Sequence, residues 1–100
     1  MKQSDLMDKI FERPVLYLDR PSVSHMQAFL DGFAVGSGIE NPKISDPLYY
    51  EFHDWLAGRF GIGHSDSWSN IVESVADSEQ EAFDLAKKLW EAYKTELRQS

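Results

Sequence analysis

The sequence predicts an all-α fold, a compact single-domain bundle of about five helices that spans residues 1–100. Apolar residues recur at intervals of three and four positions through most of the chain, which places them on one face of a helix. Segments with this spacing are separated by Ser, Asp, Pro and Gly, the residue types that begin and end helices. No two segments read as strands that could pair, and 100 residues are enough for one hydrophobic core.

The first helix is followed by a segment of a different kind. Ser4 can cap a helix that must end before Pro14, because a proline disfavours the helical conformation in the residue before it. The apolar face of this helix consists of Leu6, Ile10 and Phe11. Residues 14–20 lie between two Arg-Pro pairs, and their four apolar residues fit either a short strand or an extended connector. We favour a short extended connector, since no second strand is present to pair with it.

A second helix is expected to begin at Ser22 or Ser24 and to end near Val35. Its apolar side chains fall at i, i+3, i+4 and i+7, and they are Met26, Phe29, Leu30 and Phe33. Gly36-Ser37-Gly38 then offers the left-handed conformation that ends a helix. We expect residues 37–45 to form a loop.

The third helix has a strong start signal in Asp46-Pro47, with Asp as the cap and Pro in the first helical position. Its apolar stripe consists of Leu48, Phe52, Trp55 and Leu56, joined by Tyr49 and Phe60. Gly61-Ile62-Gly63 is expected to terminate it.

Two further helices complete the bundle. The fourth begins within residues 65–67 and is expected to bury Trp68, Ile71, Val72 and Val75. Before the fifth, Ser78-Glu79-Gln80-Glu81 has the pattern of a capping box, in which Ser and Glu each satisfy a free backbone amide. The fifth helix spans about residues 79–98 and is expected to bury Ala82, Ala86, Leu89, Trp90, Tyr93 and Leu97.

The chain is acidic, with 17 Asp and Glu against 10 Lys and Arg and a formal net charge of −7. Residues 40–84 alone contain ten carboxylates and two cations, so they carry a charge of −8. This balance argues against nucleic acid as a partner, because surfaces that bind phosphates present clustered Lys and Arg. It favours a basic protein partner that meets the middle of the chain.

The composition excludes several other classes. The absence of Cys excludes disulfides, thiolate metal sites and a cysteine nucleophile. No apolar run approaches the roughly 20 residues that span a bilayer, and the acidic N-terminal segment lacks the apolar stretch of a signal peptide. We therefore expect a soluble cytoplasmic protein that has no membrane partner.

No group of residues in the sequence indicates catalysis, a metal site or a cofactor, and we expect none of these. His53 and His64 are eleven positions apart and lack the close spacing of zinc ligands on one helical face. Ser65-Asp66-Ser67 fits helix capping better than a nucleophile beside an acid, because no turn with oxyanion donors accompanies it. The alternative is an aromatic pocket near His53 that holds a small ligand, a metal or a substrate.

The candidate site for a partner is a polar stripe on the expected fourth helix. Its members recur at i, i+4, i+7 and i+11, opposite the apolar face, and they are Asp66, Asn70, Glu73 and Asp77. On the third helix, Tyr50 and Asp54 also point away from the apolar stripe. A tyrosine beside carboxylates suits a protein interface, since Tyr anchors contacts and carboxylates steer a basic partner. A solvated helix face has the same composition, so this site is a hypothesis.

Four short motifs carry a resemblance to known sequences. They are Glu12-Arg13-Pro14-Val15-Leu16-Tyr17-Leu18, Phe29-Leu30-Asp31-Gly32-Phe33, Phe52-His53-Asp54-Trp55-Leu56 and Ser67-Trp68-Ser69-Asn70-Ile71. Together they resemble a group of small uncharacterised bacterial proteins of about this length, from which Leu16, Asp19 and Phe33 depart. The resemblance covers most of the chain and implies a bacterial cytoplasmic origin, with a leaning towards immunity proteins that bind and neutralise a toxin. With the acidic middle of the chain, it favours a non-enzymatic protein-binding module.

Overall fold

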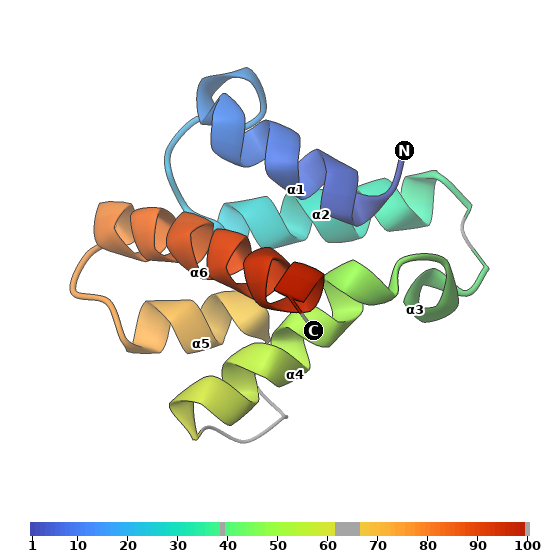
Figure 1. The fold of residues 1–100 in the computed structure, drawn as a ribbon. Coiled ribbons are helices and arrows are strands. Elements are labelled where there is room, and N and C mark those ends of the chain that lie inside the picture. The colour runs from blue at the N-terminus through green and yellow to red at the C-terminus, as the bar shows by residue number, and fades with distance from the viewer. Residues whose placement is uncertain (39, 62–66, 100) are drawn as a thin grey trace.

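The computed structural model describes residues 1–38, 40–61 and 67–99 (Figure 1). The elements in chain order are α1 (Gln3–Glu12), the 3-10 helix η1 (Pro14–Leu16), α2 (Val23–Gly36), α3 (Pro42–Ser45), α4 (Pro47–Phe60), α5 (Trp68–Ser74) and α6 (Glu79–Gln99). No strand occurs in the described residues, and the prediction of a compact all-α fold is confirmed.

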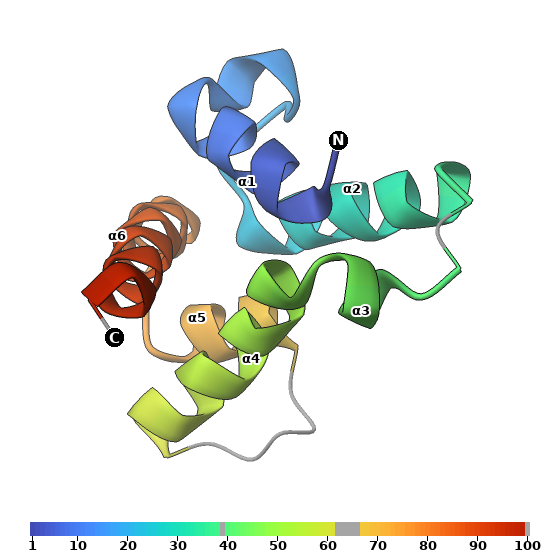
Figure 2. The ribbon, with the colours of Figure 1, turned by 45° about the vertical axis from the view of Figure 1, so that its right-hand side comes forward.

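The helices enclose one core. Helices α1 and α2 pack against each other, α4 packs against α5, and the long α6 contacts α2, α4 and α5 (Figures 1 and 2). The buried apolar residues of these five helices form a single cluster. Phe52 of α4 lies within it, and four aromatic rings surround Phe52 at centroid distances of 5.0 to 6.1 Å. These rings belong to Trp55, Trp68, Trp90 and Tyr93.

Several helix ends follow the local signals in the sequence. The Ser22 hydroxyl accepts a hydrogen bond from the backbone amide of His25, and the Ser67 hydroxyl accepts one from Asn70. Gly61 ends α4 in the left-handed conformation, with φ of 65°. At the start of α6, the Ser78 hydroxyl accepts from the amide of Glu81 at 3.1 Å, as a capping box requires. The Glu81 carboxylate accepts a hydrogen bond from the amide of Asp77. A capping box would use the amide of Ser78, one residue later.

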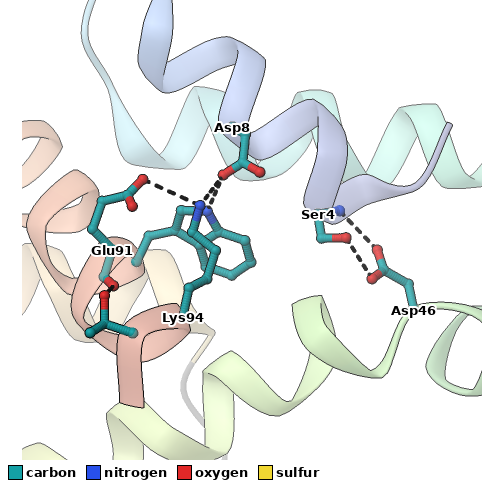
Figure 3. A network of polar contacts seen from close by, with 7 residues as sticks. Ser4, Asp8, Asp46, Glu91 and Lys94 are labelled. Atoms are coloured by element: carbon teal, nitrogen blue, oxygen red, sulfur yellow. Dashed lines mark hydrogen bonds and ion pairs between the residues drawn. The ribbon is translucent and has the colours of Figure 1, made fainter. Parts of the chain in front are cut away.

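Helix α4 begins at Asp46-Pro47 as expected, but two expected capping hydrogen bonds are absent, and one contact explains both. Ser4 lies inside α1, which begins after Lys2, and Asp46 makes no capping bond at the start of α4. Instead, the buried Asp46 carboxylate accepts hydrogen bonds from the Ser4 amide and the Ser4 hydroxyl, each at 2.8 Å (Figure 3). The two residues therefore join α1 to the start of α4.

A second polar contact joins α1 to α6 (Figure 3). Asp8 accepts a hydrogen bond from the Trp90 indole at 2.7 Å and from the Lys94 ammonium at 2.6 Å. Lys94 also pairs with Glu91 at 3.3 Å. The indole N–H of the fully buried Trp90 is therefore satisfied at the edge of the core, as buried polar groups require.

The connector and the loop are more helical than the sequence suggests. Residues 14–20 are not extended at their start, because the Pro14 carbonyl accepts from the amides of Tyr17 and Leu18 and forms η1. The expected loop 37–45 contains α3. There the Asn41 carbonyl accepts from the amides of Ile44 and Ser45.

Three side chains expected in the core are largely outside it. Phe29, Val75 and Leu97 keep 39%, 44% and 45% of their surface exposed. Val75 lies beyond the last residue of the short α5, and Leu97 lies near the end of α6. Trp68 and Trp90 are buried as expected, whereas Trp55 is only partly buried.

Candidate partner-binding groove

A groove of about 530 Å³ is bordered by α2, α3, α4 and the start of α5. Among the described residues, its lining consists of Gln27, Asp31, Lys43, Tyr49, Tyr50, Glu51, His53, Asp54, Ser67 and Trp68. Half of these side chains come from one stretch of α4. The groove therefore presents the α4 surface next to Tyr50, where the sequence places part of the candidate interface.

The aromatic part of the lining continues into the core. Tyr49 and Trp68 are almost fully buried, and the Trp68 indole donates a hydrogen bond to the Tyr49 hydroxyl at 3.0 Å. The Tyr50 ring meets the Tyr49 ring edge to face, with centroids 5.0 Å apart. Since Trp68 also packs against Phe52, these rings are held by the core itself. A partner would meet a surface that is already formed.

A polar contact joins α5 to α2 on another wall of the groove. The amide and the hydroxyl of Ser69 both donate to the side-chain oxygen of Gln27, at 3.1 and 2.5 Å. Asp31 follows Gln27 by one helical turn on α2 and also lines the groove.

The lining is predominantly acidic, because Asp31, Glu51 and Asp54 face a single Lys43 within it. Partial desolvation raises the pKa of the Asp31 carboxyl, and the neighbouring Gln27 side chain opposes part of that shift. A carboxylate whose charge is partly removed from water gains from a nearby cation. The groove therefore favours a positively charged group.

The structure brings together only part of the predicted site. Tyr50 and Asp54 line the groove, whereas Asn70 and Glu73 are exposed on α5 and Asp77 lies after its end, away from the groove lining. Asp66 lies outside the described residues. A role of these polar residues of the fourth helix in partner binding stays a prediction.

The groove also contains residues that the sequence analysis did not select. Gln27 and Asp31 belong to the second helix, and Glu51 lies beside Tyr50 on the third. The spacing of Gln27 and Asp31, four residues apart on the second helix, is the signal that could have identified that pair.

The alternative site near His53 stays a prediction. His53 lines the groove, is partly buried, and lies with its Nδ1 3.5 Å from the Asp54 carboxylate. His25 is placed elsewhere, beside Asp19 at the start of α2, and His64 lies outside the described residues. Across the described ranges, no three His, Cys, Asp or Glu side chains are grouped so that they could hold a metal ion.

Neither protein-family models, nor curated proteins, nor solved structures gave a match to this chain. Of the helices described, none is both long enough and apolar enough to cross a lipid bilayer.

Ionisation of the tyrosines is expected to destabilise the fold at alkaline pH. Burial raises the pKa of Tyr93 to about 12 and that of Tyr49 further still, from an ordinary value of 10.0. Both phenols are then neutral in the folded chain under conditions where they ionise in the unfolded chain. Their contribution to stability is present below pH 10 and is lost as the pH rises through 10 to 12.

Urea unfolding at about pH 8 and about pH 11 tests this expectation. The unfolding midpoint should fall between the two pH values, and it should fall less in Tyr49→Phe than in the parent chain. Tyr49→Phe also loses the bond from Trp68, so only the change with pH is compared between the two proteins. An equal fall in both proteins would show that Tyr49 does not contribute to the pH dependence.

Proposed function

We propose that this chain is a cytoplasmic, non-enzymatic binding protein whose groove receives a basic segment of a protein partner. The observation that carries the proposal is the composition of the groove, in which Asp31, Glu51 and Asp54 stand beside aromatic side chains with Lys43 as the one described cation. Carboxylates attract and orient a basic partner, and tyrosines provide rigid contact area. The charge of −8 over residues 40–84 extends the same preference over the surrounding chain.

The hydroxyl and imidazole groups in the groove support binding rather than catalysis. The Ser67 hydroxyl already accepts from the Asn70 amide as a helix cap, and it also contacts the Ser69 hydroxyl at 3.4 Å. A serine nucleophile needs a base positioned to take its proton and donors for the developing oxyanion. The His53 Nδ1 lies 3.5 Å from the carboxylate of Asp54. The side chains that line the groove are of the types found in protein–protein interfaces.

A titration with charged peptides tests the proposal. A labelled Lys/Arg-rich peptide of about ten residues should bind at low salt, and an acidic peptide of equal length should not. Raising the ionic strength from about 0.05 M to about 0.5 M should weaken binding, because screening shortens the range of the attraction. Fluorescence anisotropy gives the dissociation constants.

Matched variants then locate the site. Asp31→Asn with Asp54→Asn should weaken binding of the basic peptide by about tenfold, because two attractive carboxylates are lost. Glu12→Gln with Asp84→Asn removes the same charge from exposed positions outside the groove lining and should change binding by less than about twofold. Equal losses in the two double variants would contradict the groove as the binding site.

A second candidate is a small-ligand or metal-binding protein, or an enzyme, that uses the groove near His53. The partial burial of His53 beside Asp54 favours it, as does a volume within the range of small-molecule pockets. A thermal-shift screen with metals and metabolites separates the two proposals, since a bound ligand raises the melting temperature. A shift that disappears in His53→Ala would favour this second candidate.

A further inference from the structure

The segment that follows α1 leaves two aliphatic side chains largely in water. Val15 and Leu16 of η1 keep 85% and 66% of their surface exposed, whereas the next two residues, Tyr17 and Leu18, pack against the core. The Tyr17 ring meets the ring of the half-exposed Phe29 of α2 edge to face, with centroids 6.0 Å apart. We call the surface formed by Val15, Leu16, Tyr17 and Phe29 the η1 face. Exposed apolar side chains that gather in this way mark interaction surfaces.

The backbone beneath the η1 face is already ordered. The Pro14 carbonyl accepts from the amides of Tyr17 and Leu18 at 3.0 and 2.8 Å, and the Arg13 carbonyl accepts from that of Leu16 at 3.2 Å. Pro14 and Pro21 restrict the backbone near both ends of the segment. A surface that is ordered beforehand loses little conformational freedom when it is covered, which favours association.

The charges around the η1 face balance, although the chain as a whole is acidic. The charged residues of the segment 12–20 are Glu12, Arg13, Asp19 and Arg20, and their charges sum to zero, so the net charge of −7 lies in the rest of the chain. The segment follows α1 at the edge of the molecule away from α4, which supplies half of the groove lining (Figures 1 and 2). Two acidic copies repel each other where their acidic surfaces meet, and they meet little of that repulsion at a neutral face.

We propose that the η1 face is the interface of a homodimer, in which a second copy of this chain covers the exposed aliphatic side chains. A two-fold axis through the face brings the same surface of both copies together, so that apolar side chains meet apolar side chains. The face is separate from the groove, and the inference does not depend on the proposed function.

The charged residues at the two ends of the segment fit this symmetry. When two such segments cross antiparallel, Arg13 at the start of one lies near Asp19 at the end of the other. Arg13 takes part in none of the ion pairs among the described residues. Asp19 lies 3.5 Å from His25, and 83% of its side-chain surface is exposed. Arg20 already pairs with Glu79 of the same chain at 3.1 Å, so Arg13 and Asp19 are the pair that the interface can use.

Sedimentation velocity of the full chain tests the proposal. Between about 0.01 mM and about 1 mM, the weight-average mass should rise from that of one chain towards that of two, with a dissociation constant on the order of 0.1 mM for an interface of small area. Val15→Ser with Leu16→Ser should weaken dimerisation by at least about tenfold, because the burial of these side chains drives it. The matched control is Val35→Ser with Ile44→Ser, which changes side chains that are 83% and 78% exposed at the end of α2 and in α3. It should change dimerisation by less than about twofold.

A charge exchange tests the two-fold arrangement. Arg13→Asp and Asp19→Arg should each weaken dimerisation by about threefold or more, because each places like charges opposite each other. The variant that carries both changes should return to within about twofold of the parent chain, since the pair is restored with its signs reversed. Losses that simply add in this double variant would overturn the two-fold arrangement.

Salt separates this dimer from an association through the groove. Dimerisation by the η1 face should persist or strengthen between about 0.05 M and about 0.5 M salt, because screening reduces the repulsion between two acidic copies. Dimerisation that weakens about tenfold over this range would place cations of one copy against the acidic surface of the other and would overturn the proposal. A chain that stays monomeric at about 1 mM, or equal losses in the two double serine variants, would also overturn it. Circular dichroism of each variant verifies that the helical fold is retained.

Discussion

Replacing Phe52 with alanine is expected to lower the free energy of unfolding by about 4 kcal/mol. Phe52 has none of its surface exposed, and its ring contacts those of Trp55, Trp68, Trp90 and Tyr93. Truncation removes the transfer free energy of the ring and leaves a cavity between four large aromatic rings, which cannot easily fill it. Because domains of this size are stable by only about 5–15 kcal/mol, the variant should retain a small margin or unfold.

Urea unfolding followed by far-UV circular dichroism measures this effect. Phe52→Leu keeps part of the volume and should lose clearly less stability than Phe52→Ala. Val15→Ala, at a position 85% exposed, is the control and should change stability by less than about 0.5 kcal/mol. A loss in Phe52→Ala no larger than the loss in Val15→Ala would mean that the aromatic cluster is not the centre of the core.

The core also determines the shape of the groove. Trp68 packs against Phe52 on one side and donates to the Tyr49 hydroxyl on the other. A cavity at Phe52 therefore loosens the aromatic lining next to Tyr50. We expect Phe52→Leu, if it remains folded, to bind the basic peptide more weakly than the parent chain, although residue 52 does not line the groove.

Helix boundaries could be predicted from the sequence where the deciding contact is local. Ser22, Ser67 and Gly61 end or begin helices through bonds or backbone conformations within a few residues, which the sequence displays directly. Ser4 and Asp46 have equally good capping chemistry, yet they pair with each other across 42 positions. The sequence shows that each residue can cap a helix, but it does not show that a distant partner competes for the same side chain.

The sequence predicts which face of a helix is buried, but not how much of each side chain on that face is covered. The repeat of three and four positions identifies Met26 and Leu30 as core residues, and both are fully buried. Phe29 has the same spacing, but it lies at the edge of the α2 face and contacts only Tyr17 among the described rings. How far a neighbouring helix covers a stripe depends on helix lengths and crossing, which local spacing does not contain.

The groove could be predicted only in part for the same reason. The outward position of Tyr50 and Asp54 follows from the periodicity of a single helix. Their association with Asp31 depends on where α2 lies relative to α4, and the contact of Gln27 with Ser69 depends on where α5 lies. The spacing of residues within one helix does not show how that helix is placed relative to the others.

Replacing Asp46 with alanine is the second large effect that we expect, a loss of about 3 kcal/mol in the free energy of unfolding. Asp46 is 4% exposed, and its carboxylate accepts from both the amide and the hydroxyl of Ser4 at 2.8 Å (Figure 3). Alanine leaves two buried donors without an acceptor, and buried donors without partners are costly. The junction between α1 and α4 would lose its main described polar contact.

Asp46→Ser distinguishes this contact from an ordinary helix cap. Serine caps helices about as well as aspartate, so a capping role would leave Asp46→Ser near parental stability. Its shorter side chain cannot accept both bonds from Ser4, so the structure predicts a loss close to that of Asp46→Ala. In a double-mutant cycle, Ser4→Ala and Asp46→Ala should be non-additive by about 1 kcal/mol, because the two residues share one contact. Additive losses from these two changes, measured by urea unfolding, would show that Asp46 stabilises α4 independently of Ser4.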